Sequence, residues 1–336
     1  MTLSEQARTV DSPWNRYSER LPRVTHRTVS VNGITMHIAE QGEGPLVLLL
    51  HGWPETWYSW RHQFQALADA GYHVVAPDQR GYGGTDRPEA VDQYSILHLV
   101  GDAVALIDAL GEQTAVVVGH DWGAPVAWHT ALLRPDRVRA VVGLSVPYRA
   151  RTPAPPIGFM TQRFGAGFYQ VYFQQRGVPE AALGRDLPDT FRRVLVGASG
   201  DGPAPIPIIP EGGSFLDLMP HPERLPSWLT EEDIAAFVEQ FARSGFSGGL
   251  NWYRNIDRNW ELTAAWATAR ITAPALFVTG DRDLVRKFGG PDMIAALPKW
   301  LPHLRGVIDL PGCGHWTQQE RPAEVNAALL EFLKAL

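Results

Sequence analysis

The chain of 336 residues has a single cysteine, Cys313, so it cannot form an internal disulfide and is expected in a reducing compartment. It has no long apolar stretch, because runs such as Leu46–Leu50 are far too short to span a bilayer. Residues 1–27 are polar and charged and lack the apolar centre of a signal peptide. The net charge of −6, without basic runs, argues against nucleic acid or an anionic membrane surface as a partner. These absences predict a cytoplasmic protein without a membrane span.

Apolar residues are plentiful, at 45% of the chain, which suits one large α/β domain with an insertion or two domains sharing one site. Alternating residues around Asn32-Gly33 predict a β-hairpin. Apolar runs predict further strands at residues 46–50, 74–76, 115–118, 139–145, 275–279 and 306–310. Helical patterns occur at residues 57–70, 95–110, 124–133 and 323–333. This order predicts a mixed, mostly parallel sheet with helices on both faces.

The interval 147–260 differs from the rest, because it is rich in aromatic residues, Gln and Arg and shows only helical patterns, notably at 167–175 and 231–243. We predict a helical cap there, inserted after the sixth strand. Residues 1–146 and 261–336 would form the two parts of the core, with residues 1–25 as an N-terminal extension. The Pro- and Gly-rich stretch 197–226 is predicted to be a long surface loop.

The most informative segment is the one around Asp121, where an apolar, β-branched run ends in Gly119-His120-Asp121-Trp122-Gly123 and a helical pattern follows. A strand, a tight turn and a helix, with a nucleophile between small residues, are typical of the nucleophile elbow of α/β-hydrolases. A carboxylate attacks esters poorly, because the product is a high-energy anhydride, but it can attack a saturated carbon that has a leaving group. Epoxides and alkyl halides are therefore the expected substrates. The alternative is that Asp121 only caps the following helix.

Two more predicted strands end in residues suited to catalysis. Asp281 and Asp283 follow the strand at 275–279, and His315 follows the strand at 306–310 in a glycine-lined loop. The carboxyl ends of parallel strands meet at one edge of a sheet, and the order nucleophile, acid, histidine is that of the α/β-hydrolase triad. We predict His315 as the general base and one of the two aspartates as the acid.

Backbone amides are expected to stabilise the negative charge that develops during ester hydrolysis. The fold takes one such N–H from the loop after its third strand, here Trp53, and another from the residue after the nucleophile, here Trp122. His51 and His120 are expected to brace loops, and Cys313 is expected to pack as a small apolar residue.

Several motifs together resemble the soluble epoxide hydrolases. They are residues 51–61 (HGWPETWYSWR), 119–123 (GHDWG), 312–318 (GCGHWTQ) and, in the predicted cap, 169–174 (YQVYFQ) and 251–255 (NWYRN). The resemblance extends from about residue 25 over nearly the whole chain and is particularly close to the hydrolase domain of the vertebrate enzymes. The chain has no room for the phosphatase domain of those enzymes, so no phosphatase activity is expected. The stretch 197–226 lies outside the resemblance, and the one role expected of it is a place at the rim of the substrate pocket.

The resemblance implies that Tyr169 and Tyr253 donate protons to the epoxide oxygen. Chemistry makes the same demand, since ring opening at neutral pH otherwise leaves an alkoxide; Tyr172 is the rival donor in its own segment. The family pattern also places the acid at Asp283, with Asp281 bracing the loop. Some related dehalogenases take the acid from after the sixth strand, but residues 144–147 contain no carboxylate. We further expect a substrate pocket lined by Trp122, Gln170, Ile256 and Trp316.

The predicted function is hydrolysis of a small apolar epoxide by water to a vicinal diol, through a covalent ester of Asp121, without a metal ion or cofactor. A haloalkane or haloacid dehalogenase is the alternative, with the indoles of Trp53 and Trp122 binding halide. A second alternative is a hydrolase-like protein that binds an apolar ligand without turnover. Release of halide, formation of diol, or binding alone would distinguish the three.

Overall fold

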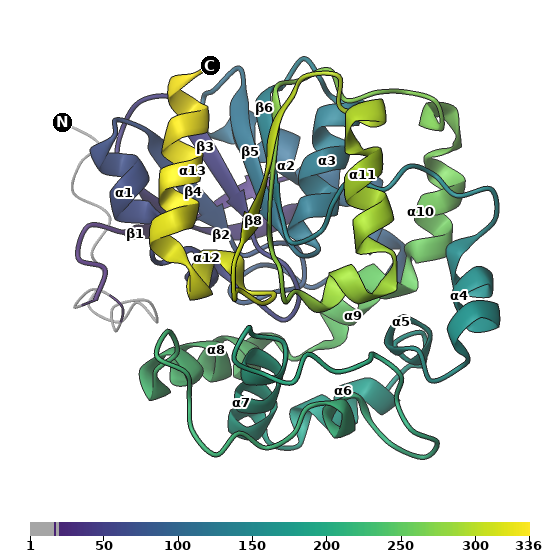
Figure 1. The fold of residues 1–336 in the computed structure, drawn as a ribbon. Coiled ribbons are helices and arrows are strands. Elements are labelled where there is room, and N and C mark those ends of the chain that lie inside the picture. The colour runs from purple at the N-terminus through teal and green to yellow at the C-terminus, as the bar shows by residue number, and fades with distance from the viewer. Residues whose placement is uncertain (1–16, 18–19) are drawn as a thin grey trace.

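The computed structural model describes Tyr17 and residues 20–336, which form an eight-stranded sheet in the order β1-β2-β4-β3-β5-β6-β7-β8 (Figure 1). The strands are β1 (Thr25–Val31), β2 (Ile34–Gln41), β3 (Leu46–Leu50), β4 (His73–Pro77), β5 (Ala115–His120), β6 (Val138–Leu144), β7 (Ala275–Gly280) and β8 (Leu304–Leu310). Strand β2 pairs antiparallel with β1 and β4, and the remaining pairs are parallel. The predicted mixed, mostly parallel sheet is therefore confirmed.

Helices cover both faces of this sheet, as predicted (Figure 1). Helices α2 (Ile96–Ala109) and α3 (Gly123–Leu133) pack together, and α1 (Phe64–Asp69) packs with the C-terminal α13 (Pro322–Lys334). The core also contains η3 (Val91–Tyr94), η5 (Ala264–Trp266), η6 (Leu284–Phe288), α11 (Gly290–Trp300) and α12 (Thr317–Glu320).

The single helix predicted over residues 57–70 is wrong. The segment forms a 3₁₀ turn, η2 (Trp57–Trp60), and then the separate helix α1. All four residues of η2 are buried, and the Trp57 amide donates to the Asp78 carboxylate at 3.1 Å. A single amphipathic helix over residues 57–70 would keep one face in solvent, whereas every residue of η2 is buried.

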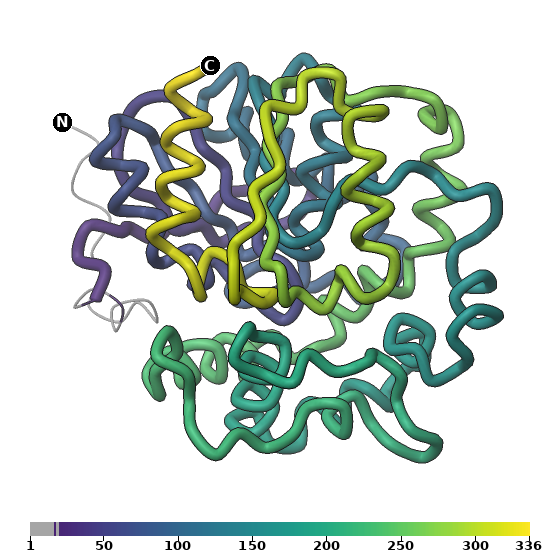
Figure 2. The backbone as a smooth tube through the Cα atoms, viewed as in Figure 1, coloured from purple at the N-terminus to yellow at the C-terminus, as the bar shows by residue number. Residues whose placement is uncertain are grey.

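Between β6 and β7 the chain leaves the core, builds a layer of helices over one edge of the sheet, and returns (Figures 1 and 2). Its helices are α4 (Pro156–Phe164), α5 (Tyr169–Tyr172), α6 (Val178–Gly184), α7 (Leu187–Gly197), η4 (Phe215–Leu218), α8 (Glu231–Ser244), α9 (Ser247–Arg254) and α10 (Ile256–Leu262). Helix α8 begins where predicted, behind a Thr230–Asp233 capping box. The helix predicted at 167–175 shortens to α5, and the boundary expected at residue 260 falls inside α10.

The Pro- and Gly-rich stretch is more than a surface loop, which corrects the prediction for residues 197–226. It contains η4, and its side chains Ile209, Phe215 and Met219 are buried. Its backbone is also tied to the segment around α5, because Pro207 O accepts the Tyr169 amide at 3.0 Å. None of the helices in the described part of the chain has both the length and the apolarity needed to cross a membrane.

Candidate active site

Asp121 occupies the tight turn between β5 and α3, with a positive φ of 49°. A residue other than glycine in this left-handed region is strained, at a cost of about 1–3 kcal/mol. The flanking glycines make the turn possible, since a Cβ on Gly119 would lie 2.0 Å from Gly123 O and one on Gly123 would lie 2.0 Å from Leu50 O. The surrounding backbone therefore fixes the carboxylate at the carboxyl edge of the sheet.

His315 lies between two carboxylates from the neighbouring strand ends. Its Nε2 is 3.3 Å from Asp121 Oδ2, and its Nδ1 is 3.1 Å from Asp283 Oδ1. The same Asp283 oxygen accepts the Val285 amide at 2.9 Å, which fixes the acid in place. Asp281 instead accepts the Gly312 amide at 2.8 Å and braces the loop that leads to His315. The structure thus brings Asp121, His315 and Asp283 together and leaves Asp281 outside the group.

The charges of these groups are coupled. Burial alone would raise the pKa of Asp121, but His315 and the Trp53 amide stabilise the carboxylate and lower that pKa. Burial alone would lower the pKa of His315, but the carboxylates of Asp283 and Asp121 raise it well above its ordinary value. In the site without substrate, these shifts favour an ionised Asp121 beside a protonated His315.

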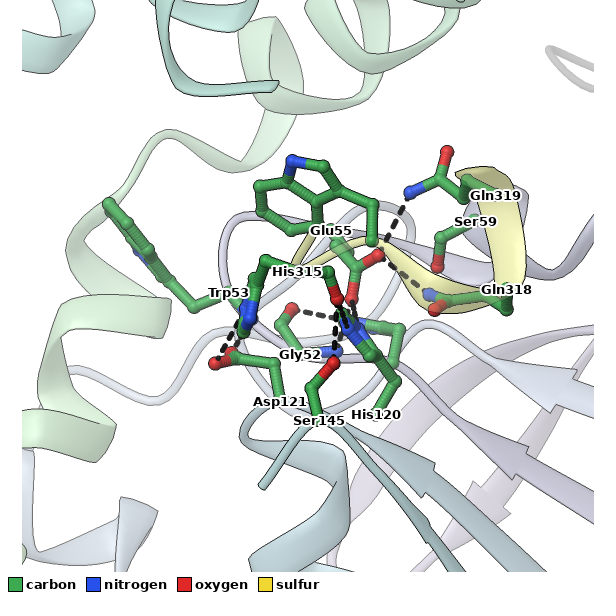
Figure 3. A network of polar contacts seen from close by, with 12 residues as sticks. Gly52, Trp53, Glu55, Ser59, His120, Asp121, Ser145, His315, Gln318 and Gln319 are labelled. Carbon is green, nitrogen blue, oxygen red and sulfur yellow. Dashed lines mark hydrogen bonds and ion pairs between the residues drawn. The ribbon is translucent and has the colours of Figure 1, made fainter. Parts of the chain in front are cut away.

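The Trp53 amide donates to Asp121 Oδ1 at 2.7 Å (Figure 3). Trp122 directly follows the nucleophile at the N-terminus of α3. The two indoles differ in their surroundings: Trp53 Nε1 has no hydrogen-bond partner among the described residues, whereas the Trp122 indole donates towards the Tyr253 hydroxyl.

Tyr169 and Tyr253 reach the site from the helices α5 and α9, with their ring centroids 6.0 Å apart. Burial and the nearby Asp121 charge raise the pKa of both phenols, so both keep their protons at neutral pH. Each hydroxyl also receives a hydrogen bond from a neighbour, since Gln170 Nε2 donates to Tyr169 Oη at 2.8 Å and Trp122 serves Tyr253. Each phenol O–H can therefore donate its proton to another acceptor in the site.

A cavity of about 320 Å³ is lined by Asp121 and by residues of α4, and a smaller one of about 50 Å³ is lined by Asp121 and His315. Trp122, Gln170 and Ile256 line the larger cavity, and Trp316 lines the smaller one. Tyr172 lines neither cavity. The described residues contain no group of three or more His, Cys, Asp or Glu side chains placed to hold a metal ion.

A buried network behind the triad was not predicted as a unit (Figure 3). Glu55 accepts hydrogen bonds from the Gly52 amide, His120 Nδ1 and the side-chain amides of Gln318 and Gln319. Burial disfavours the Glu55 carboxylate, but His120 beside it holds the pKa of Glu55 below its ordinary value. The motif 51–61 contained Glu55, but nothing in the sequence indicated that it pairs with a residue 65 positions away.

His120 connects this network to His315. Its Nδ1 lies 2.7 Å from Glu55 Oε2 and its Nε2 lies 2.7 Å from the carbonyl oxygen of His315, so both ring nitrogens face acceptors. Ser145, at the end of β6, donates to the same His315 carbonyl at 2.6 Å. These two bonds hold the backbone of His315 in place.

The sheet, elbow and triad geometry are those of an α/β hydrolase, and a family model for the alpha/beta hydrolase fold matches residues 45–322. The chain is 49% identical to epoxide hydrolase A of Mycobacterium tuberculosis, over 93% of this chain and 98% of that one. The crystal structure of epoxide hydrolase A from Mycobacterium thermoresistibile superposes with a TM-score of 0.88 at 48% identity, covering 93% and 98% of the two chains. Bifunctional epoxide hydrolase 2 of Mus musculus is 39% identical over 93% of this chain and 56% of its own. The chain therefore belongs to the epoxide hydrolases of the α/β-hydrolase fold.

Proposed function

We propose that this chain converts an apolar epoxide and water to a vicinal diol in two steps, through a covalent ester of Asp121. The observation that most strongly supports this function is the placement of two protonated phenols and one ionised carboxylate around a single cavity. The carboxylate supplies the nucleophile, and the phenols supply protons to the opposite end of the breaking C–O bond.

In the first step, an Asp121 oxygen attacks one epoxide carbon, the C–O bond to that carbon breaks, and its electron pair goes to the epoxide oxygen. Tyr169 and Tyr253 hydrogen-bond that oxygen, and one of them transfers its proton to it. Gln170 and Trp122 orient the two hydroxyls by donating to them.

In the second step, Asp121 no longer carries a negative charge, because its carboxylate has become an ester. His315 has then lost one of the two carboxylates that stabilise its proton. This proton passes to the phenolate that the first step leaves, which restores the tyrosine. The neutral imidazole then accepts a proton from water. The resulting hydroxide attacks the carbonyl carbon of the ester, and the amides of Trp53 and Trp122 stabilise the oxyanion. Collapse of this intermediate releases the diol and restores the Asp121 carboxylate, while Asp283 stabilises the imidazolium that forms.

The polar contacts also weigh against halide as the leaving group. A halide site would use the indole N–H groups of Trp53 and Trp122, but the Trp122 ring lies edge-to-face with the phenol of Tyr253, with the ring centroids 5.2 Å apart. A weakly basic halide also gains little from two phenol protons. The dehalogenase alternative is therefore not favoured. We further propose a cytoplasmic location, on the basis of the single buried Cys313.

The test is one turnover of styrene oxide in ¹⁸O-labelled water with enzyme in excess. We expect the label in the Asp121 carboxylate and unlabelled oxygen in the first diol, measured by mass spectrometry of the Asp121 peptide and of the product. Asp121→Asn is the matched control and should form no ester initially. Label directly in the first diol would show that water attacks the epoxide itself and would exclude the covalent route.

A further inference from the structure

The two cavities beside Asp121 are lobes of one site, because both are lined by Asp121, Tyr169 and Tyr253. When the epoxide oxygen lies at the tyrosines and one ring carbon faces the carboxylate, the substituents on the two ring carbons diverge to either side. One substituent then enters the lobe of about 320 Å³ and the other enters the lobe of about 50 Å³. At about 10–15 Å³ per water-sized group, the smaller lobe has room for about three to five such groups.

The Pro- and Gly-rich stretch forms much of the wall of the smaller lobe and none of the wall of the larger one. Its contributing residues are Ala198, Pro205, Pro207, Phe215, Leu218 and Met219. Phe215 is the central one, with its ring 5.4 Å from that of Trp53, 5.1 Å from that of Phe173 and 6.2 Å from that of Tyr169.

This wall is held at several points. Pro207 O accepts the Tyr169 amide at 3.0 Å, and the Ile209 amide donates to Gly167 O at 2.7 Å. Arg193 Nε from α7 donates to Met219 O at 2.6 Å. These bonds tie both ends of the wall to the helical cap, so the small lobe does not widen without breaking them.

His315 lines the small lobe and not the large one. The water that His315 activates must therefore occupy the same space as the second substituent of the ester. A bulky second substituent both exceeds the lobe and displaces this water, which affects the hydrolysis step as well as binding.

We infer that the natural substrates are epoxides with one large apolar substituent and, on the other ring carbon, hydrogen or a small alkyl group. Phe215 is the residue of the wall that sets this limit. The inference rests on the proposed covalent route, because it assigns the space beside His315 to the ester and its water.

The test compares styrene oxide, trans-β-methylstyrene oxide and trans-stilbene oxide, with kcat/KM for the diol and the amount of ester from intact mass. We expect similar values for the first two and at least a tenfold lower kcat/KM for trans-stilbene oxide. The ester that trans-stilbene oxide does form should persist. Phe215→Ala and the milder Leu218→Ala should reduce the ratio of kcat/KM between styrene oxide and trans-stilbene oxide at least threefold. Both variants should also break down the trans-stilbene oxide ester faster.

The matched control is Leu216→Ala, because Leu216 is buried in the same short helix but lines neither lobe. Leu216→Ala should leave the ratio of kcat/KM for styrene oxide to kcat/KM for trans-stilbene oxide unchanged. The inference would be overturned if the wild-type kcat/KM for trans-stilbene oxide were within threefold of that for styrene oxide. It would also be overturned if Leu216→Ala changed the ratio of the two values as much as Phe215→Ala does. Diol from styrene oxide without any ester would instead refute the covalent route, so the two failures are distinguishable.

Discussion

Replacing both tyrosines by phenylalanine tests the roles proposed for the helical cap. Tyr169→Phe and Tyr253→Phe each remove one oriented donor and keep the ring that packs in the cavity wall. Removing one preorganised donor of this kind costs about 10²–10³ in rate, or about 2.7–4 kcal/mol. The two hydroxyls receive separate hydrogen bonds, from Gln170 and from Trp122, so neither depends on the other for its orientation. The double variant should therefore form the ester about 10⁴–10⁶-fold more slowly.

The assay must isolate alkylation, and a His315→Gln background does so, because an ester formed there is not hydrolysed. The rate of ester formation from styrene oxide is measured by quenching at set times and recording intact mass. Tyr172→Phe is the matched control, since Tyr172 lies in the same helix as Tyr169 but lines neither cavity. If the double variant formed the ester within tenfold of the rate of the His315→Gln parent, the reasoning would be refuted. The dehalogenase alternative would then deserve a direct halide-release assay.

The remaining predictions concern the triad and the elbow. His315→Gln should accumulate enzyme plus one substrate in intact mass, and normal turnover would contradict its role as the base. Asp283→Asn should slow ester hydrolysis by about 10³–10⁴-fold with little change in alkylation, seen as ester that decays slowly. Because the pKa of Asp121 is lowered, alkylation should stay constant as the pH falls through neutrality. Ester hydrolysis should decline as the pH falls, because Asp283 raises the pKa of His315 and the base must be neutral; parallel declines would argue against this assignment. Gly123→Ala, whose Cβ would lie 2.0 Å from Leu50 O, should destabilise the fold by about 3 kcal/mol or more in urea unfolding, and a loss below 1 kcal/mol would contradict the packing argument.

The parts of the fold and site that were predictable are those with a local cause. The Asn32-Gly33 turn, with φ of 46° and 78°, joins two alternating strands, and the hairpin forms as expected. Asp121 and His315 could be proposed because each follows a strand in a glycine-containing loop. The cap tyrosines depended on the family resemblance, since no local pattern indicates that α5 and α9 face the same carboxylate.

Features that depend on distant contacts were missed. The Glu55–His120 pair joins residues 65 positions apart, and its effect on His315 passes through a backbone carbonyl. The Pro and Gly content of the stretch around Phe215 predicts a surface loop. Its burial follows from hydrogen bonds to the α5 segment, such as the one between Pro207 and Tyr169, which composition does not reveal.

The chain separates the two proposed chemical steps between two structural layers. The phenols that open the ring come from the segment between β6 and β7, whereas the base, the acid and the Trp53 amide come from the sheet and its loops. Insertions or exchanges in that one segment can therefore change which epoxides are opened without replacing the residues proposed to carry out ester breakdown. This division lets related proteins diversify their substrates through a single connection of the chain, without rebuilding the part that regenerates the nucleophile.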